Sequence, residues 1–189
     1  MRPILISGPA IEPVSLAEAK LWLRVDDNAQ DDALATLISA ARLAIEAMTR
    51  SLLITQSWQL LADNWAQSSV VELPLGPVRT VDAIRVSDAN GDMQALAPTQ
   101  WRVSANAQTA RLSFIGTPPS PGRPVGGIEI DVTAGYGDAP GDVPLSLRQA
   151  MLLLIARWFE NRGDAAADVV RPPGDVELLI APHRRVRLV

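Results

Sequence analysis

The sequence predicts an α+β fold, in which a helical core is interrupted by an inserted, mostly antiparallel β lobe. Apolar residues recur with the helical period in residues 15–50 and again in 144–163, whereas residues 52–134 alternate with the period of two that marks half-buried strands. The last region, 164–189, starts as a linker rich in Ala, Pro and Gly and ends as an extended tail. A single domain over residues 1–189 accommodates all three, because single cores typically run to about 100–200 residues.

The core is expected to begin with two N-terminal helices. The first spans Ser15 to about Arg24, because Ser15 and Glu18 have the spacing of a capping box, in which each side chain accepts a backbone N–H of the first turn. The second carries apolar residues at i, i+3, i+4, i+7, i+11 and i+14, which form one face of a helix. They are Leu34, Leu37, Ile38, Ala41, Ile45 and Met48.

Four aspartates precede the second helix: Asp26, Asp27, Asp31 and Asp32. Carboxylates are favoured at a helix N-terminus, which carries a partial positive charge. A metal site is the alternative, but a calcium-binding loop needs alternating oxygen donors, a Gly at its sixth position and a Glu at its twelfth. That pattern does not occur here, so the aspartates are interpreted as a helix start and no metal is expected.

The β lobe is expected to contain seven strands. They are predicted near residues 54–60, 70–75, 80–86, 93–96, 101–103, 110–114 and 127–133. Asn90-Gly91 is a strong hairpin signal between the third and fourth of them. In the last strand, Ile128, Ile130 and Val132 should face one side and Glu129, Asp131 and Thr133 the other.

The third helix of the core, Leu145 to Arg162, is apolar on almost every side. A helix of this kind must be covered on all sides, and a small domain offers limited cover. We therefore expect part of it to lie in an interface with a second copy of the chain. The subunit-interface residues expected there are Leu153, Trp158 and Phe159.

Composition argues against several functions. The net charge of −4 lacks the basic footprint of a general nucleic-acid binder. The longest apolar run, residues 150–156, is too short for a bilayer, which needs about twenty residues. The N-terminus is too short and too proline-broken for a signal peptide, so no membrane association is expected.

Catalytic chemistry is also not expected. The chain has no Cys and a single His, His183, which excludes an ordinary zinc ligand set. No nucleophile elbow, dinucleotide loop or phosphate-binding loop is present. The sequence therefore predicts no catalytic, cofactor or metal site and no enzyme. A carboxylate pair hidden among the twenty-one acidic residues stays open as a distant alternative, a small hydrolase.

The tail mixes basic and apolar residues: His183, Arg184, Arg185, Val186, Arg187, Leu188 and Val189. It is either a solvated end or a strand that docks on another protein, since alternating Val, Leu and Arg suit addition to a sheet edge. Contact with DNA is less favoured because the rest of the chain is acidic.

Several segments, in this order and spacing, resemble the head-to-tail connector (adaptor) family of long-tailed phages, prophages and gene transfer agents. They accompany the apolar helix at 147–162 and are Pro13-Val14-Ser15-Leu16-Ala17-Glu18-Ala19-Lys20, Leu23-Arg24-Val25-Asp26, Ile45-Glu46-Ala47-Met48-Thr49, Ile54-Thr55-Gln56-Ser57-Trp58, Leu73-Pro74-Leu75-Gly76-Pro77-Val78, Ala134-Gly135-Tyr136-Gly137, Val143-Pro144 and Pro182-His183-Arg184-Arg185-Val186-Arg187.

The resemblance implies a ring of copies, usually twelve, beneath the portal of the filled capsid. Such a ring receives the next neck protein (the stopper) and the tail, and DNA passes transiently through its channel, where acidic walls would let it slide. The chain would be assembled in the bacterial cytoplasm and reside in the neck of a virion or phage-like particle. Residues 183–189 are the expected portal-docking tail. A stopper or tail terminator, another neck structural protein, is the close alternative.

Overall fold

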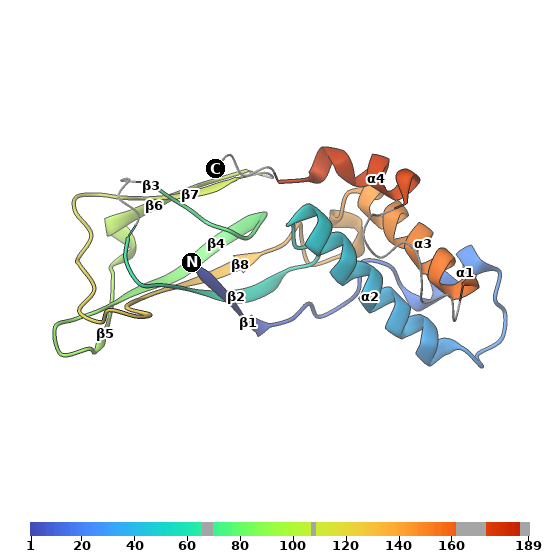
Figure 1. The fold of residues 1–189 in the computed structure, drawn as a ribbon, viewed down its shortest axis with the longest axis horizontal. Helices are drawn as coiled ribbons and strands as arrows, with labels where there is room; N and C mark the ends of the chain where they lie inside the picture. Colours follow the sequence, from blue (N-terminus) through green and yellow to red (C-terminus); the bar gives the residue numbers. More distant parts are fainter. Residues whose placement is uncertain (66–69, 107–108, 162–172, 186–189) are drawn as a thin grey trace. The chain divides into compact units, whose positions relative to one another are not determined.

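The computed structural model describes residues 1–65, 70–106, 109–161 and 173–185 (Figure 1). Within them it has four α-helices and two antiparallel sheets, so the predicted α+β class is confirmed. The chain divides into two compact units. The β-rich unit holds residues 1–10 and 55–136, and the helical unit holds residues 11–54 and 137–189. The chain therefore passes between the units three times.

The larger sheet of the β-rich unit has five strands in the order β1-β2-β8-β4-β5, and every neighbouring pair is antiparallel. Its strands are β1 (Arg2–Ser7), β2 (Gln56–Ala62), β4 (Val78–Ser87), β5 (Met93–Ala95) and β8 (Ile128–Ala134). The β4–β5 pair turns through Asn90 and Gly91, where Gly91 takes a left-handed φ of 89°. The predicted hairpin is therefore present.

The smaller sheet has three strands in the order β3-β7-β6. They are β3 (Val70–Glu72), β6 (Trp101–Ala105) and β7 (Ala110–Phe114). Figure 1 shows the two sheets as layers of the β-rich unit. Leu60, Ile84 and Ile130 of the larger sheet are buried, as are Val71 and Leu112 of the smaller one. These side chains form the apolar core of the unit.

Strand β8 lies at the centre of the five-stranded sheet and shows the predicted alternation. Ile128, Ile130 and Val132 are buried, while Glu129, Asp131 and Thr133 are half-buried on the opposite face. Strand β1 was not predicted. Ile4, Leu5 and Ile6 are consecutively apolar and do not alternate with polar residues, and both faces of the strand are exposed in the protomer.

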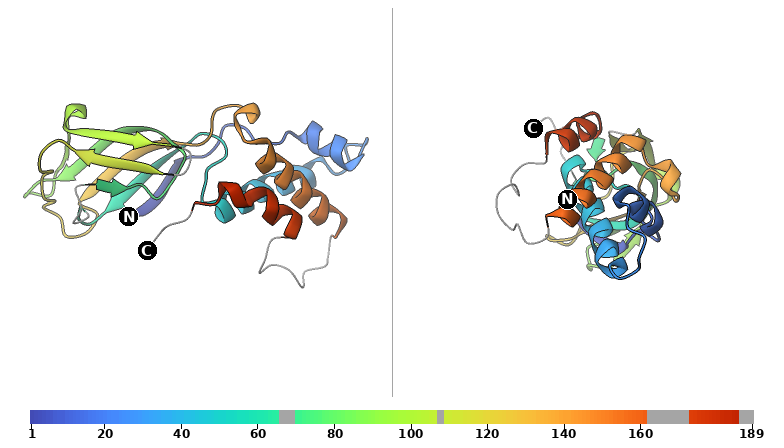
Figure 2. Two further views of the ribbon diagram at one scale, coloured as in Figure 1. Left: turned by 90° about the horizontal axis from the view of Figure 1, so that it is seen from above. Right: turned by 90° about the vertical axis from the view of Figure 1, so that its right-hand side faces the viewer.

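The helical unit contains α1 (Leu16–Leu23), α2 (Asp31–Thr49), α3 (Leu145–Glu160) and α4 (Gly174–Ile180). The first three correspond to the helices predicted from the sequence. Helix α3 lies beside α2 and α4 in both views and also contacts α1 (Figures 1 and 2). Its buried face comprises Leu147, Ala150, Met151, Leu152, Leu154 and Ile155. None of the helices in the described ranges combines the length and hydropathy needed to cross a membrane.

Candidate assembly surfaces

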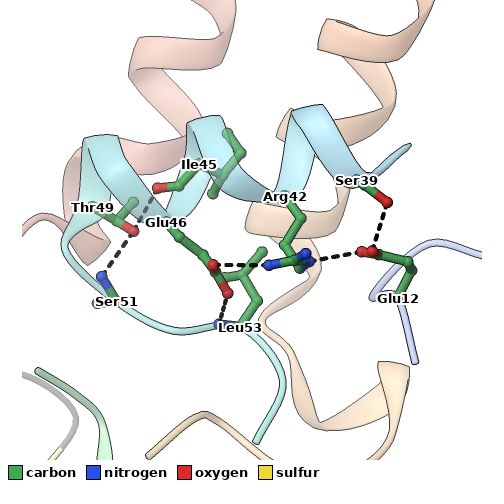
Figure 3. A network of polar contacts seen from close by, with 8 residues as sticks. All are labelled: Glu12, Ser39, Arg42, Ile45, Glu46, Thr49, Ser51 and Leu53. Atoms are coloured by element: carbon green, nitrogen blue, oxygen red, sulfur yellow. Dashed lines mark hydrogen bonds and ion pairs between the residues drawn. The ribbon is translucent and has the colours of Figure 1, made fainter. Parts of the chain in front are cut away.

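A buried polar cluster on α2 holds two connecting segments of the chain (Figure 3). The Arg42 guanidinium pairs with Glu12 at 2.8 Å and with Glu46 at 3.1 Å. Ser39 donates a hydrogen bond to the other oxygen of Glu12 at 2.9 Å, and Glu46 accepts the backbone N–H of Leu53 at 2.9 Å. Arg42 and Glu46 are only 9% and 8% exposed, so their charges depend on these partners.

The cluster fixes the segments that lead to and from the β-rich unit. Glu12 follows the first passage of the chain between the units, and Leu53 precedes the second. After the third passage, Gly137 forms a parallel bridge with Ile54. A side chain at Gly137 would collide with Asp142, which accepts the backbone N–H of Ala139. All three passages are thus anchored by contacts within the helical unit.

Helix α1 is secured at its N-terminus by half of the predicted capping box. Ser15 is the N-cap residue and its hydroxyl accepts the N–H of Glu18 at 3.1 Å. The Glu18 carboxylate does not return to the N-cap, because it pairs with Arg148 of α3 at 2.6 Å. Arg148 also donates to the carbonyl of Pro13 at 3.1 Å. A long-range ion pair therefore replaces the local hydrogen bond expected from the spacing.

The aspartates before α2 are engaged in local contacts. Asp31 and Asp32 form the first turn of α2, as predicted, and Asp31 pairs with Lys20 at 2.8 Å. Asp27 accepts the N–H of Ala29 at 2.9 Å, while Asp26 is exposed. Across the residues that the structure describes, no group of three His, Asp or Glu side chains is placed to hold a metal ion.

The three predicted subunit-interface residues on α3 are each partly exposed in the protomer. Leu153 lies between buried Leu152 and Leu154, on the side of α3 that also presents Leu145, which is 75% exposed. Trp158 and Phe159 lie in the last turns of the helix. Helices α1, α2 and α4 cover most of α3, so the apolar surface left open is smaller than the sequence alone indicated.

The first part of the predicted docking tail rests on the helical unit. His183 belongs to a short 3-10 helix (Ala181–His183), and its Nε2 lies 2.8 Å from the hydroxyl of Ser146 on α3. Burial lowers the pKa of His183 below its ordinary value. Arg184 pairs with Glu177 at 3.1 Å, and the N–H of Arg185 donates to the carbonyl of Thr49. The remaining predicted residues, Val186, Arg187, Leu188 and Val189, lie outside the described residues.

The outer face of the five-stranded sheet carries a charge cluster that the sequence analysis did not identify. Arg85 of β4 pairs with Glu129 at 2.9 Å and with Asp131 at 2.7 Å, both on β8. Gln59 of β2 donates to the same two carboxylates. The two carboxylates raise the pKa of Arg85. The alternation of β8 indicated which residues share this face, but only the strand order shows which residues lie opposite them.

Large apolar side chains are exposed on both units, and they come from several different elements. Each of these side chains belongs to a residue with more than a third of its surface open to solvent. On the β-rich unit they include Ile4, Leu5, Ile6, Ile115 and Val125, and on the helical unit Leu21, Trp22, Leu43, Leu145 and Leu178. Scattered exposed apolar residues are ordinary, whereas a large contiguous apolar patch marks an interaction surface.

Comparison with known proteins identifies related chains. The family model described as "Phage gp6-like head-tail connector protein" matches residues 13–93. A chain in the structure of the neck of an empty gene transfer agent particle, computed with C6 symmetry, has 33% identity and a TM-score of 0.85, and the match covers 100% of this chain and 98% of that chain.

Two further structures match over the same proportions of both chains. The virion of a native gene transfer agent particle gives 33% identity and a TM-score of 0.85, and the neck of a native particle computed with C12 symmetry gives 33% and 0.82. No curated protein sequence matches the chain significantly.

These relatives define a class, the structural neck proteins of phage-like particles. Within that class, the chain belongs to the phage gp6-like head-tail connector family, which is the family that the sequence resembled.

Proposed function

We propose that the chain is the adaptor of a particle neck: a ring of twelve copies that joins the capsid portal to the tail and surrounds the channel for DNA. The observation that carries this proposal is the likeness along the entire chain, at 33% identity, to a chain of a neck computed with C12 symmetry. The role is structural, so it requires no catalytic group, cofactor or metal. A structural role depends on contacts with other copies and other proteins, and therefore on exposed surfaces.

One feature of the structure and one of the composition suit a ring around passing DNA. The partly exposed Leu153, Trp158 and Phe159 leave apolar surface on α3 for a neighbouring copy. The net charge of −4 per copy would surround passing DNA with like charge, which disfavours tight binding to its phosphates.

The portal-docking segment is proposed to be the C-terminal tail, with a division of roles along it. His183, Arg184 and Arg185 contact the helical unit and form the base of the tail. Val186, Arg187, Leu188 and Val189 would then extend to the portal, where the apolar side chains fill shallow pockets and Arg187 pairs with carboxylates or carbonyls. Copies around a ring would act together, so modest affinity per tail suffices for a stable joint.

Electron microscopy of purified particle necks, with the chain labelled by an inserted tag, tests the proposed position. We expect a ring of label in direct contact with the portal. A ring that contacts only tail-side proteins would contradict the adaptor role and indicate a stopper or tail terminator.

Deletion of residues 186–189 tests the tail separately. This variant keeps the contacts of His183, Arg184 and Arg185 and should fold normally, but it should no longer join filled heads to tails. The matched control replaces the same four residues with Gly and Ser, which keeps the length and removes the side chains. Transfer-competent particles from both variants would show that the portal is bound elsewhere.

A further inference from the structure

Strand β1 forms an open edge of the five-stranded sheet. It pairs with β2 through Arg2, Pro3, Ile4 and Leu5, and among the residues that the structure describes no strand pairs with its other side. All six residues of β1 are exposed. Open edges in soluble proteins are usually short, charged, or covered by another element. This edge has one charge, Arg2, and is otherwise apolar up to the irregularity in pairing between Leu5 and Ser7.

The proline in β1 determines which backbone groups face the open side. A proline is accepted within a sheet only where its nitrogen points away from the paired strand. Pro3 lies opposite Leu60 of β2, so its nitrogen faces the open edge. Residues two positions apart have the same orientation in a strand, which directs the N–H and C=O of Leu5 to the open edge as well. Leu5 thus offers a donor and an acceptor to an added strand.

Within its described residues, the β-rich unit has a second open edge of similar length. The other outer strands of its two sheets are β3, β5 and β6. Strands β3 and β5 have three residues each, whereas β6 has five. Strand β6 packs against β4, which is three strands away from β1 in the larger sheet, so the β1 and β6 edges lie toward opposite sides of the unit. Arg102 and Ser104 of β6 are exposed.

We infer that the open edge of β1 in one copy pairs with the edge of β6 in the next copy, so that hydrogen-bonded strands join neighbouring β-rich units around a ring. This inference rests on the proposed ring. A closed ring with cyclic symmetry needs two different surfaces on each copy, each complementary to the other. Two edges of matching length on opposite sides of one unit meet that need. Strand addition would also bury the exposed Ile4 and Leu5.

Cysteine cross-linking tests the pairing directly, because the natural chain has no Cys. Ile4→Cys is combined in turn with Arg102→Cys and with Ser104→Cys, in rings assembled on the portal protein or in purified particles. Side chains on paired strands lie within about 8 Å of each other even when they are diagonal neighbours. A bifunctional maleimide of that span should join copies into a ladder of multimers on a denaturing gel.

Two control variants test whether the cross-links are specific to the β1–β6 pair. Ile4→Cys combined with Gln94→Cys, on exposed β5, should give no ladder. Ile4→Cys alone should also give none. Efficient dimers from Ile4→Cys alone would overturn the proposal, since they would show two β1 strands pairing with each other. Absence of a ladder from both β1–β6 combinations in assembled rings would overturn it as well.

A second pair of variants separates the effect of the backbone hydrogen bond from that of the side chain. Leu5→Pro removes the N–H that faces the open edge, whereas Leu5→Ala keeps it and removes most of the side chain. Because ring contacts repeat, the loss of one hydrogen bond per copy should lower ring assembly by about tenfold or more relative to Leu5→Ala. Equal melting temperatures of the two monomers would establish that the fold is retained, and equal assembly would contradict the inference.

The proposed function and the strand pairing can be contradicted separately. If the natural chain forms no ring on the portal, the proposed function is wrong. If it forms rings that neither cross-link between β1 and β6 nor respond to Leu5→Pro, only the strand pairing is wrong.

Discussion

The carboxylate of Glu46 accepts a hydrogen bond from the backbone N–H of Leu53 at 2.9 Å, and the same side chain pairs with Arg42 at 3.1 Å. Glu46 is 8% exposed and lies in α2, whereas Leu53 lies in the segment that leads to β2. The end of the helix and the start of the connection are therefore held by one buried carboxylate. Because Arg42 also binds Glu12, the first connection depends on the same cluster.

Replacing Glu46 should destabilise the helical unit. Glu46→Ala leaves the Leu53 N–H without its acceptor and Arg42 with one carboxylate, which should cost about 3 kcal/mol in the free energy of unfolding. Glu46→Gln keeps an acceptor for Leu53 and should cost less. Urea denaturation measures both, with Glu160→Gln on the exposed end of α3 as a control. Equal stability of Glu46→Ala and the natural chain would show that the cluster contributes nothing.

Removing Arg148 should have a smaller effect, because its pair with Glu18 is partly exposed. Arg148→Met loses the 2.6 Å ion pair and the bond to Pro13, at a cost of about 1–2 kcal/mol. The matched control is Arg111→Met on β7. Arg111 and Glu72 are 3.5 Å apart and more than half exposed, so their loss should cost under about 1 kcal/mol. Thermal melting of both variants gives the comparison, and a larger effect at Arg111 would contradict it.

Substitutions on α3 should separate folding from assembly. Leu154 is 3% exposed, so Leu154→Asp places a charge in the core and should cost several kcal/mol, enough to unfold a marginal unit. Leu153→Asp and Phe159→Asp are partly exposed and should give folded protein that fails to form rings on the portal. Circular dichroism and electron microscopy measure the two properties. Normal rings from both of the latter variants would remove these two positions of α3 from the interface.

The contact between His183 and Ser146 should make stability depend on pH. Burial lowers the pKa of His183, so the folded chain favours the neutral ring and the unfolded chain binds the proton more readily. The stability that comes from burying the neutral ring is fully present above the ordinary pKa of histidine, and it is lost as the pH falls from there through the lowered pKa of the folded chain. Unfolding should therefore require less urea at pH 5 than at pH 7.5, and His183→Gln should remove part of that difference. An identical pH dependence in the variant would show that carboxylates account for it.

The sequence by itself determined the elements whose burial repeats along the chain. The apolar stripe of α2 and the alternation of β8 each report one buried face, because a side chain's direction follows from its position in a helix or strand. The order of these patterns, with the connector motifs, also indicated the class of protein.

Tertiary structure decided what depends on partners distant in the chain. Glu18 had the spacing of a capping residue but pairs with Arg148, which lies 130 residues away. Strand β1 does not alternate between apolar and polar residues, so its sequence did not predict a strand. It is a strand because it pairs with β2, and both of its faces are exposed. His183, at the start of a basic tail, lies against Ser146 of α3. Local periodicity specifies which way a side chain points, but it does not specify which side chain it will meet, since that is set by how the folded chain brings remote segments together.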